Sequence, residues 1–274
     1  LPDTHHHDPD VARNRSPRVG RLRRMGLETF SSSWPIIRFD EIDSTNEEAR
    51  RRASGSDIGP CWLVTAAQTA GRGRLGRQWS SPRGNLYATA LLPFPGSLQE
   101  AALACFSAGL AVTDAAKSLG VDSSQLKLKW PNDVLVGSAK LAGILIETGM
   151  LHGRLWMAAG FGVNVEVAPE RADRVTPCLT AQPGGADATA PRLLAMLDIS
   201  FRARLFQLLG EGFGATREAW LDQAAGIGAR VELTPASGRI EGIMTGLTED
   251  GALILRLADG SETHVRAGEI SVLG

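Results

Sequence analysis

The chain has 274 residues, of which 43% are hydrophobic and 22% are charged, as is usual for a globular protein with one large domain and one small one. Its formal net charge of −1 excludes a general attraction to nucleic acid or to anionic membranes, so any basic cluster is a local feature. Three cysteines without a Cys-x-x-Cys pair, and no uncharged apolar run of about 18 residues, argue against a disulfide framework, a zinc site and a membrane span. We therefore expect a cytoplasmic protein without membrane contacts.

The first 33 residues are polar and show no hydrophobic periodicity, so a disordered leader is expected over residues 1–33. Such a leader is too short for the packed helices of a helix-turn-helix module, and DNA binding is therefore not expected. Three of the five histidines form the run 5–7, which leaves His152 and His264. Both are expected at the surface, so a Ser-His-Asp or Cys-His mechanism, which requires a catalytic histidine, is not expected.

A short strand is predicted at residues 36–39, followed by a helix that begins near Ser44. Ser44 or Thr45 can cap this helix, and a glutamate three residues later can complete a capping box. The same hydroxyls, together with the amide of Asn46, can also hydrogen-bond a polar ligand. The cap and the ligand contact both remain open.

A loop rich in glycine and arginine lies between apolar strands expected at residues 61–65 and 86–92. It holds four glycines and four arginines within fourteen residues, 71–84. Glycine lets the backbone approach a ligand closely, and the planar arginine fork matches phosphate or carboxylate oxygens. We interpret the stretch as a loop that closes over an anion, with a solvated basic loop or an RGG-type nucleic-acid segment as alternatives. It lacks the Gly-Lys-Ser/Thr of a P-loop, and no helix pattern follows it, as a dinucleotide fingerprint would require.

The middle of the chain alternates between helix and strand patterns. The predicted elements are a buried helix at 97–120, a strand at 126–130, a hairpin of 133–136 with 140–147, and a strand at 155–165. These elements predict an α+β fold, in which a mainly antiparallel mixed sheet carries helices on one face.

The last third of the chain changes character after Gly226. Helices are expected at 191–209 and 213–224, and short strands at 230–234, 239–247, 252–257 and 262–266, joined by Asp-Gly hairpin turns. The predicted division is a leader at 1–33, a large domain at 34–226 and a small β-barrel domain at 227–274.

Three blocks along the chain match one family in their order and spacing. They are Gly-Arg-Gly-Arg-x-Gly-Arg-x-Trp at 71–79, Lys-Trp-Pro-Asn-Asp at 129–133 and Lys-Leu-Ala-Gly-Ile-Leu-Ile-Glu at 140–147. Together they resemble the biotin–protein ligases, in the short form without an N-terminal DNA-binding domain. The resemblance implies a class II synthetase-like catalytic domain and a C-terminal SH3-like barrel. It also implies an enzyme that uses ATP and Mg²⁺ to activate biotin as biotinoyl-5′-AMP, and then passes the biotinoyl group to a lysine of a biotin carboxyl carrier protein.

The same resemblance assigns residues to the site. The expected catalytic residues are Lys140, Arg74 and Asp133, and Asp133 is also the expected Mg²⁺ ligand. Read without the family, Lys140 would be a surface lysine and Asn132-Asp133 a turn former. The expected biotin-binding residues are Ser44, Thr45, Asn46, Gln68, Gly71, Arg72, Gly73, Arg74, Lys140 and Gly143. The expected ATP-binding residues are Arg74, Arg77, Trp79, Lys129, Asn132, Lys140 and Asn164.

Two other functions compete with this one. A lipoate or octanoate ligase or transferase of the same superfamily shares the general fold and a lysine like Lys140, but it is not expected to have the Gly-Arg loop. A nucleic-acid-binding protein predicts excess basic charge, which 29 basic and 30 acidic residues do not supply. A homodimer formed through a strand edge remains open.

Overall fold

The computed structural model describes residues 27–169, 176–233 and 238–273. A seven-stranded sheet, with the order β1-β2-β3-β7-β6-β5-β4, forms the centre of the large domain. Among its described strands only β1 and β2 pair in parallel, which confirms the mainly antiparallel mixed sheet. The strands are β1 (Ile36–Ile42), β2 (Cys61–Gln68), β3 (Leu86–Pro93), β4 (Leu126–Lys129), β5 (Asp133–Val136), β6 (Ala139–Leu151) and β7 (Arg154–Val163).

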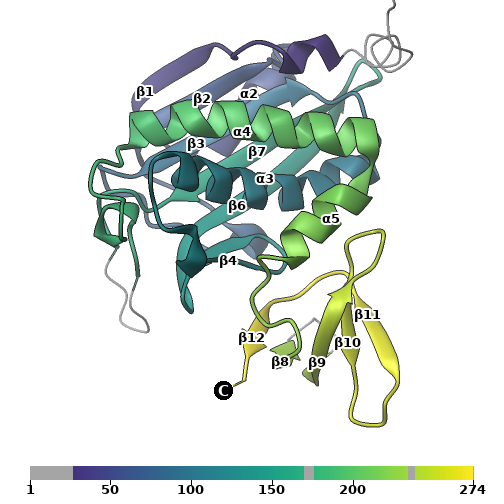
Figure 1. Ribbon diagram of the computed structural model, residues 1–274. Coiled ribbons are helices and arrows are strands. Elements are labelled where there is room, and N and C mark those ends of the chain that lie inside the picture. Colours follow the sequence, from purple (N-terminus) through teal and green to yellow (C-terminus); the bar gives the residue numbers. More distant parts are fainter. Residues whose placement is uncertain (1–26, 170–175, 234–237, 274) are drawn as a thin grey trace, which may run out of the picture.

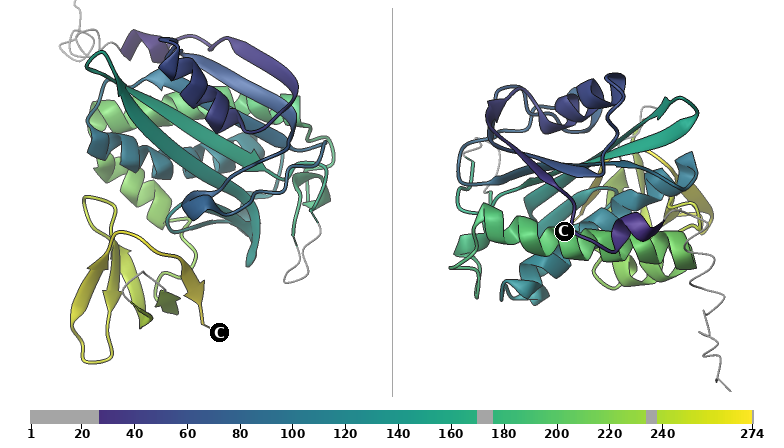
Figure 2. Two further views of the ribbon diagram at one scale, coloured as in Figure 1. Left: turned by 180° about the vertical axis from the view of Figure 1, so that it is seen from behind. Right: turned by 90° about the horizontal axis from the view of Figure 1, so that it is seen from above.

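Helices lie on both sides of this sheet. The long helices α3 (Leu98–Ser118) and α4 (Ala190–Glu211) pack on one face, with α5 (Phe213–Leu221) beside them (Figure 1). The short helix α2 (Thr45–Ser54) lies on the opposite face (Figure 2). The expectation of helices on one face therefore holds for α3, α4 and α5 and was wrong for α2.

Helices can pack on both faces of the sheet because its strands are apolar at successive positions. In β2, Trp62 and Val64 join the core beneath α3 and α4, whereas Leu63 packs with Ala49 and Ala53 of α2. A strand that is buried on both faces has no polar alternation. The apolar run of β2 carried this signal in the sequence.

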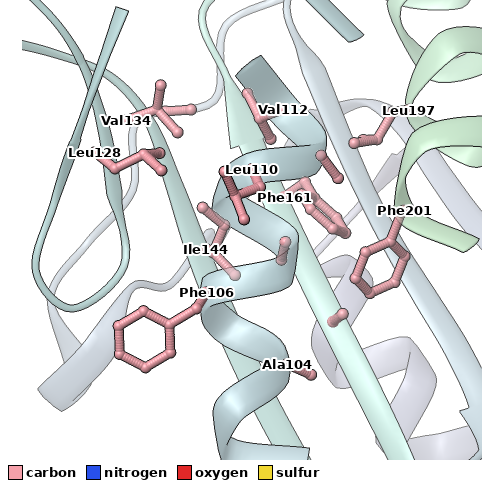
Figure 3. Close-up of a cluster of buried hydrophobic side chains, with 14 of the residues drawn as sticks. Ala104, Phe106, Leu110, Val112, Leu128, Val134, Ile144, Phe161, Leu197 and Phe201 are labelled. Carbon is pink, nitrogen blue, oxygen red and sulfur yellow. The ribbon is translucent and has the colours of Figure 1, made fainter. Parts of the chain in front are cut away.

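The larger core lies between the sheet, α3 and α4 (Figure 3). A capping box starts α3, because Ser97 Oγ accepts from the backbone N–H of Glu100 while the Glu100 carboxylate accepts from that of Ser97. Phe161 of β7 and Phe201 of α4 meet edge to face, with their ring centroids 5.1 Å apart. This packing anchors β7 from one side and leaves its other side for the site.

The chain joins the core earlier than expected. A short 3-10 helix, η1 (Leu27–Phe30), precedes β1, and Phe30 and Trp34 are buried. Trp34 Nε1 donates to Thr29 O (2.8 Å), and Arg202 of α4 donates to Phe30 O (2.8 Å). The expected leader was therefore wrong for residues 27–33, where Phe30 reaches the core. The rest of that leader, residues 1–26, lies outside the described residues.

Asp198 ties this N-terminal segment to the core. Its carboxylate accepts from Trp62 Nε1 (2.8 Å) and from Nε and Nη2 of Arg202 (3.2 and 2.9 Å). We expect Asp198→Ala to lower the free energy of unfolding by about 3–5 kcal/mol, because a largely buried guanidinium loses its partner. Urea unfolding measures the loss. Asp114→Ala, which removes the more exposed ion pair with Arg204, should cost less than about 1 kcal/mol, and equal losses would contradict the prediction.

A second, five-stranded antiparallel sheet forms the C-terminal domain, with the order β11-β10-β9-β8-β12 (yellow in Figure 1). It confirms the small all-β domain, and both expected Asp-Gly turns have a left-handed glycine, with φ of 78° at Gly251 and 83° at Gly260. The strands are β8 (Arg230–Leu233), β9 (Ile240–Leu247), β10 (Leu253–Arg256), β11 (Glu262–Val265) and β12 (Ile270–Val272). The last strand was not expected, because three residues are too few to show a clear alternation.

The cysteines and the two histidines outside the run 5–7 are placed as expected from the sequence. All three cysteines are free, and His152 and His264 are exposed. In the part of the chain that the structure describes, no helix is long and apolar enough to cross a membrane.

Candidate active site

A cavity of about 660 Å³ opens on the face of the sheet that carries α2. Strands β6 and β7, the start of α2, the glycine loop (residues 69–85) and the turn before β5 contribute to its lining. It gathers most of the residues expected for the site, from segments far apart in the sequence: Ser44, Thr45, Asn46, Gln68, Arg72, Gly73, Arg74, Arg77, Trp79, Asn132, Asp133, Lys140 and Gly143.

Three expected residues do not line the cavity. Gly71 is buried within the glycine loop, where a Cβ would come within 2.6 Å of Trp79 O. Lys129 Nζ lies 3.6 Å from Glu269 Oε1. Asn164 is buried and donates to Pro177 O (3.1 Å), so its expected contact with ATP stays a prediction without support from the geometry.

The start of α2 turns polar groups toward the cavity. Ser44 occupies the N-cap position, but its hydroxyl makes no capping hydrogen bond, and the expected capping box is absent. Ser44, Thr45 and Asn46 are all buried and line the cavity. Of the two interpretations left open for this segment, the geometry favours the ligand contact.

The glycine loop folds as a small hairpin. Arg72 and Gln78 form an antiparallel bridge, and Gly73 N donates to Arg77 O (2.7 Å). At the tip, Gly76 has a φ of 71°, a left-handed conformation that glycine adopts without steric cost. The sequence pattern therefore builds an ordered hairpin rather than a solvated coil.

Arg74 is the cation of this hairpin that has no acidic partner among the described residues. Arg72 pairs with a glutamate of α2, and Arg77 pairs with Glu269 of the C-terminal domain. Arg74 Nη1 instead donates to the neutral amide oxygen of Asn132 (3.2 Å). None of the described residues neutralises its charge, so it is available to an anion in the cavity.

Lys140 reaches the cavity because of a β-bulge. Val134 pairs with Ala142, but the next residue, Leu135, pairs with Lys140, so Leu141 is an extra residue in β6. Leu141 and Ala142 both face the main core. With a strict period of two, Lys140 would lie on the same face as Ala142 and point into that core.

The ammonium group of Lys140 lies between a carboxylate and an aromatic ring. Its Nζ is 2.7 Å from Asp133 Oδ1 and 5.2 Å from the centroid of the Trp79 ring. Asp133 Oδ1 is buried, and the Lys140 ammonium group is within hydrogen-bonding distance of it. Lys140 and Asp133 therefore form a compact charge pair in the cavity.

Strand glycines leave room for Trp79 and Asn46. Gly143 and Gly162 are cross-strand partners, and a Cβ at Gly162 would lie 2.6 Å from the Trp79 indole. A Cβ at Gly160 would lie 2.0 Å from Asn46 Oδ1. Gly160 and Gly162 were not among the expected site residues, although glycines inside an apolar strand are a recognised sign of close approach.

One wall of the cavity, formed by Thr45 and Gln68, is uncharged and polar. Gln68 Oε1 accepts from Thr45 N (2.9 Å), and Gln68 Nε2 donates to Ser81 Oγ (2.9 Å). Thr89 of β3 lies beneath this polar wall, fully buried, with its Oγ1 2.8 Å from Thr45 Oγ1. The supporting residues Ser81 and Thr89 were not predicted, because single hydroxyl residues form no pattern in a sequence.

The C-terminal domain contributes Glu269 to the cavity lining. Its carboxylate accepts a hydrogen bond from Arg77 and lies near Lys129. Burial acts to raise the pKa of Glu269, but Arg77, Lys129 and Lys140 together hold that pKa below its usual value. No motif in the sequence indicated this contact, because its members are almost 200 residues apart.

Two family signatures match the chain. Residues 40–159 match the biotin/lipoate A/B protein ligase family, and residues 226–273 match the biotin protein ligase C-terminal domain. A biotin–[acetyl-CoA-carboxylase] ligase of Paracoccus denitrificans is 37% identical over 233 residues, which cover 83% of this chain and 96% of that protein. The chain belongs to the biotin–protein ligase family.

Solved structures of biotin–protein ligases share the fold. The enzyme of Aquifex aeolicus, in complex with biotin and ATP, has a TM-score of 0.72 and 28% identity, over 87% of this chain and 98% of that one. The enzyme of Leishmania major, in complex with biotinyl-5-AMP, has a TM-score of 0.58 and 26% identity, over 85% of this chain and 99% of that one. Membership of the biotin–protein ligase family makes this chain a ligase and confirms the expected class of fold.

Proposed function

We propose that this ligase activates biotin with ATP, giving biotinoyl-5′-AMP and pyrophosphate, and then transfers the biotinoyl group to a lysine of a biotin carboxyl carrier protein. The observation that carries the proposal is that one cavity combines two unlike surfaces. Arg74 and Lys140 supply positive charge, whereas Thr45 and Gln68 supply neutral hydrogen-bonding groups. An anionic reaction centre requires the first surface, and an uncharged polar ring such as the cyclic urea of biotin suits the second.

The first step brings two anions together. A carboxylate oxygen of biotin attacks the α-phosphorus of ATP, and the bond from that phosphorus to the bridging oxygen of pyrophosphate breaks. At a separation of about 4 Å, two like unit charges repel by about 1 kcal/mol in water and by several times more in a drier site. Lys140 and Arg74 offset this repulsion, and fixed cations act most strongly where water is excluded.

Asp133 suits a Mg²⁺ ion that is held mainly by substrate phosphates. Mg²⁺ prefers oxygen ligands and usually binds through one or two carboxylates, several waters and phosphate oxygens. Asp133 Oδ1 is buried, and the Lys140 ammonium group 2.7 Å from it shows that the position tolerates positive charge. When bound, the ion would supply charge neutralisation at the phosphates. Asp133 is the residue that would hold it.

The glycine loop then protects the product of the first step. Biotinoyl-5′-AMP is a mixed anhydride that water hydrolyses, so the site must exclude solvent until the acceptor arrives. The hairpin that carries Arg74 and Trp79 is bounded by glycines and closes onto β6 and β7. In the second step, the amine of the acceptor lysine attacks the acyl carbon and AMP leaves, and we assign Asp133 to the vicinity of that amine.

Lipoate or octanoate is the second candidate substrate, because the family that matches residues 40–159 includes lipoate ligases. Exchange of labelled pyrophosphate into ATP separates the candidates, since it requires only the first step. We expect exchange that depends on biotin and is absent with lipoate or octanoate. Exchange with lipoate alone would contradict the biotin assignment, and absence of exchange with every acid would contradict the adenylation step.

The contact of Glu269 with the glycine loop yields a prediction for ATP binding. We expect Glu269→Lys to raise the KM for ATP by about 10-fold, because a cation there repels Arg77 and Lys129 and displaces the loop. Pyrophosphate exchange at varied ATP concentration measures this change. Glu262→Lys makes the same charge reversal at an exposed position of β11 and should leave the KM unchanged, so equal effects of the two variants would refute the prediction.

A further inference from the structure

A series of buried side chains connects Glu147 of β6 to the polar wall of the cavity. Glu147 Oε2 accepts from Asn46 Nδ2 (2.8 Å), and Asn46 Oδ1 lies 2.7 Å from Thr89 Oγ1. Thr89 Oγ1 lies 2.8 Å from Thr45 Oγ1. Asn46, Thr89 and Thr45 are each at most 4% exposed, so water does not compete for the bonds among these three side chains. Neither Glu147 nor Thr89 lines the cavity, and neither was among the expected site residues, although Glu147 ends the block at 140–147.

The orientation of the Asn46 amide is fixed by its two neighbours on β6. Its Nδ2 faces the Glu147 carboxylate and also the backbone oxygen of Leu145 (3.3 Å). Glu147 pairs with the Arg50 guanidinium, and an ionised carboxylate can only accept hydrogen bonds, as can a carbonyl. Both hydrogens of the amide nitrogen are therefore used on this side. Asn46 Oδ1 must face Thr89.

The directions of the next two hydrogen bonds follow from counting hydrogens. Asn46 Oδ1 cannot donate, so Thr89 uses its single hydroxyl hydrogen toward Asn46. The contact between Thr89 and Thr45 then needs the hydrogen of Thr45. Gln68 Oε1 lies farther from Thr45 Oγ1 (3.3 Å) and already accepts from Thr45 N (2.9 Å). Toward the cavity, Thr45 Oγ1 is left with lone pairs only.

We propose that Glu147 is a positioning residue that fixes the hydrogen-bond direction of the polar wall. Its carboxylate makes Thr45 Oγ1 an acceptor toward the ligand, so the cavity selects a ring that carries an N–H donor. The cyclic urea of biotin has such donors, and the dithiolane ring of lipoate has none. This inference rests on the proposed function, because it concerns how the same site chooses its acid.

A purely structural role for Glu147 is the rival explanation. Arg50 joins Glu147 (2.5 Å) to Glu47 (3.4 Å), and Glu47 in turn pairs with Arg72 of the glycine loop (2.5 Å). On that explanation Glu147 matters because it anchors α2 through Arg50. The two roles use different oxygens of the carboxylate, since Oε1 meets Arg50 and Oε2 meets Asn46. They can therefore be separated by removing the two partners in turn.

The test compares Glu147→Leu with Arg50→Ala, which removes the ion pair but keeps the acceptor for Asn46. Calorimetry gives the dissociation constants of biotin, of desthiobiotin, which has the same cyclic urea, and of octanoate, which has an acid chain without a ring. We expect Glu147→Leu to weaken biotin and desthiobiotin by about 10–100-fold, because a buried hydrogen bond loses its defined direction. Octanoate binding and the KM for ATP should stay unchanged. Arg50→Ala should change biotin binding by no more than about 2-fold, as is usual for exposed ion pairs.

Thr89→Val breaks the same series of bonds without touching Arg50, and it serves if Glu147→Leu does not fold. It should give the same selective loss of biotin and desthiobiotin. Equal losses for Glu147→Leu and Arg50→Ala, or unchanged biotin binding in both Glu147→Leu and Thr89→Val, would overturn the inference. Failure of the unaltered protein to bind biotin would instead overturn the proposed function and, with it, the inference.

Discussion

Replacement of Lys140 by alanine should lower the rate of biotin adenylation by on the order of 10²–10³-fold, the usual cost of removing one fixed group that stabilises developing charge. Lys140 Nζ stands 2.7 Å from Asp133 Oδ1 and 5.2 Å from the Trp79 ring, inside the cavity that also holds Arg74. Its removal leaves the negative charge of Asp133 beside the place where two further anions must meet. The loss should therefore fall mainly on the rate of the chemical step, which biotin-dependent pyrophosphate exchange measures at saturating substrates.

Lys127→Ala is the matched control for this variant. Lys127 lies on β4 with its side chain exposed, and it does not line the cavity. The Lys127→Ala variant removes a positive charge from the same sheet and should leave the exchange rate unchanged. An unaltered rate in Lys140→Ala, or an equal loss in Lys127→Ala, would show that the sheet contributes no specific cation to the reaction.

Replacement of Gly160 by alanine should weaken biotin binding by on the order of 10²-fold, since displacements of about 1 Å in a site have effects of that size. A Cβ at this position would lie 2.0 Å from Asn46 Oδ1 and 2.9 Å from Asn46 Cγ. The Asn46 side chain cannot simply rotate away, because Glu147, Leu145 and Thr89 hold its amide. One added methyl group therefore disturbs the polar wall from the sheet below it.

Gly246→Ala gives the comparison for Gly160→Ala. Gly246 lies within β9 of the C-terminal domain, and a Cβ there would meet only Ile254 Cδ1, at an ordinary contact distance of 3.9 Å. Both variants add the same methyl group to a strand glycine. Calorimetry with biotin should separate them, and normal affinity in Gly160→Ala would mean that Asn46 is not part of the biotin site.

The sequence predicted the residue types of the site much better than their arrangement. Most of the residues in the three blocks and in the segment Ser44–Asn46 meet at one cavity, because the blocks occupy loops and strand ends on one face of the sheet. The bulge at Leu141 could not be predicted, although it turns Lys140 from the core to the cavity. A bulge depends on the register between two strands, and a single strand pattern does not contain that register.

Contacts between segments that are distant in the sequence could not be predicted either. Glu269 meets Arg77 only because the C-terminal domain packs near the glycine loop, and Glu147 reaches Asn46 only because α2 lies across β6. Glu269 lies in no motif, and Glu147 ends the block at 140–147 without any sign in the sequence of which residue it contacts. Gly160 and Gly162 could have been predicted as site residues. Glycines inside an apolar strand indicate that another group approaches the strand closely, as Asn46 and Trp79 do here.

On the proposed function, one cavity holds biotin and ATP together and joins them. The most direct measurement is a single-turnover reaction of the protein with biotin, ATP and Mg²⁺ in the absence of any carrier protein, quenched and examined by mass spectrometry. We predict close to one equivalent of biotinoyl-5′-AMP per protein molecule, retained by the unaltered protein and absent from Lys140→Ala. Recovery of unchanged biotin and ATP from the unaltered protein would show that this cavity does not join them.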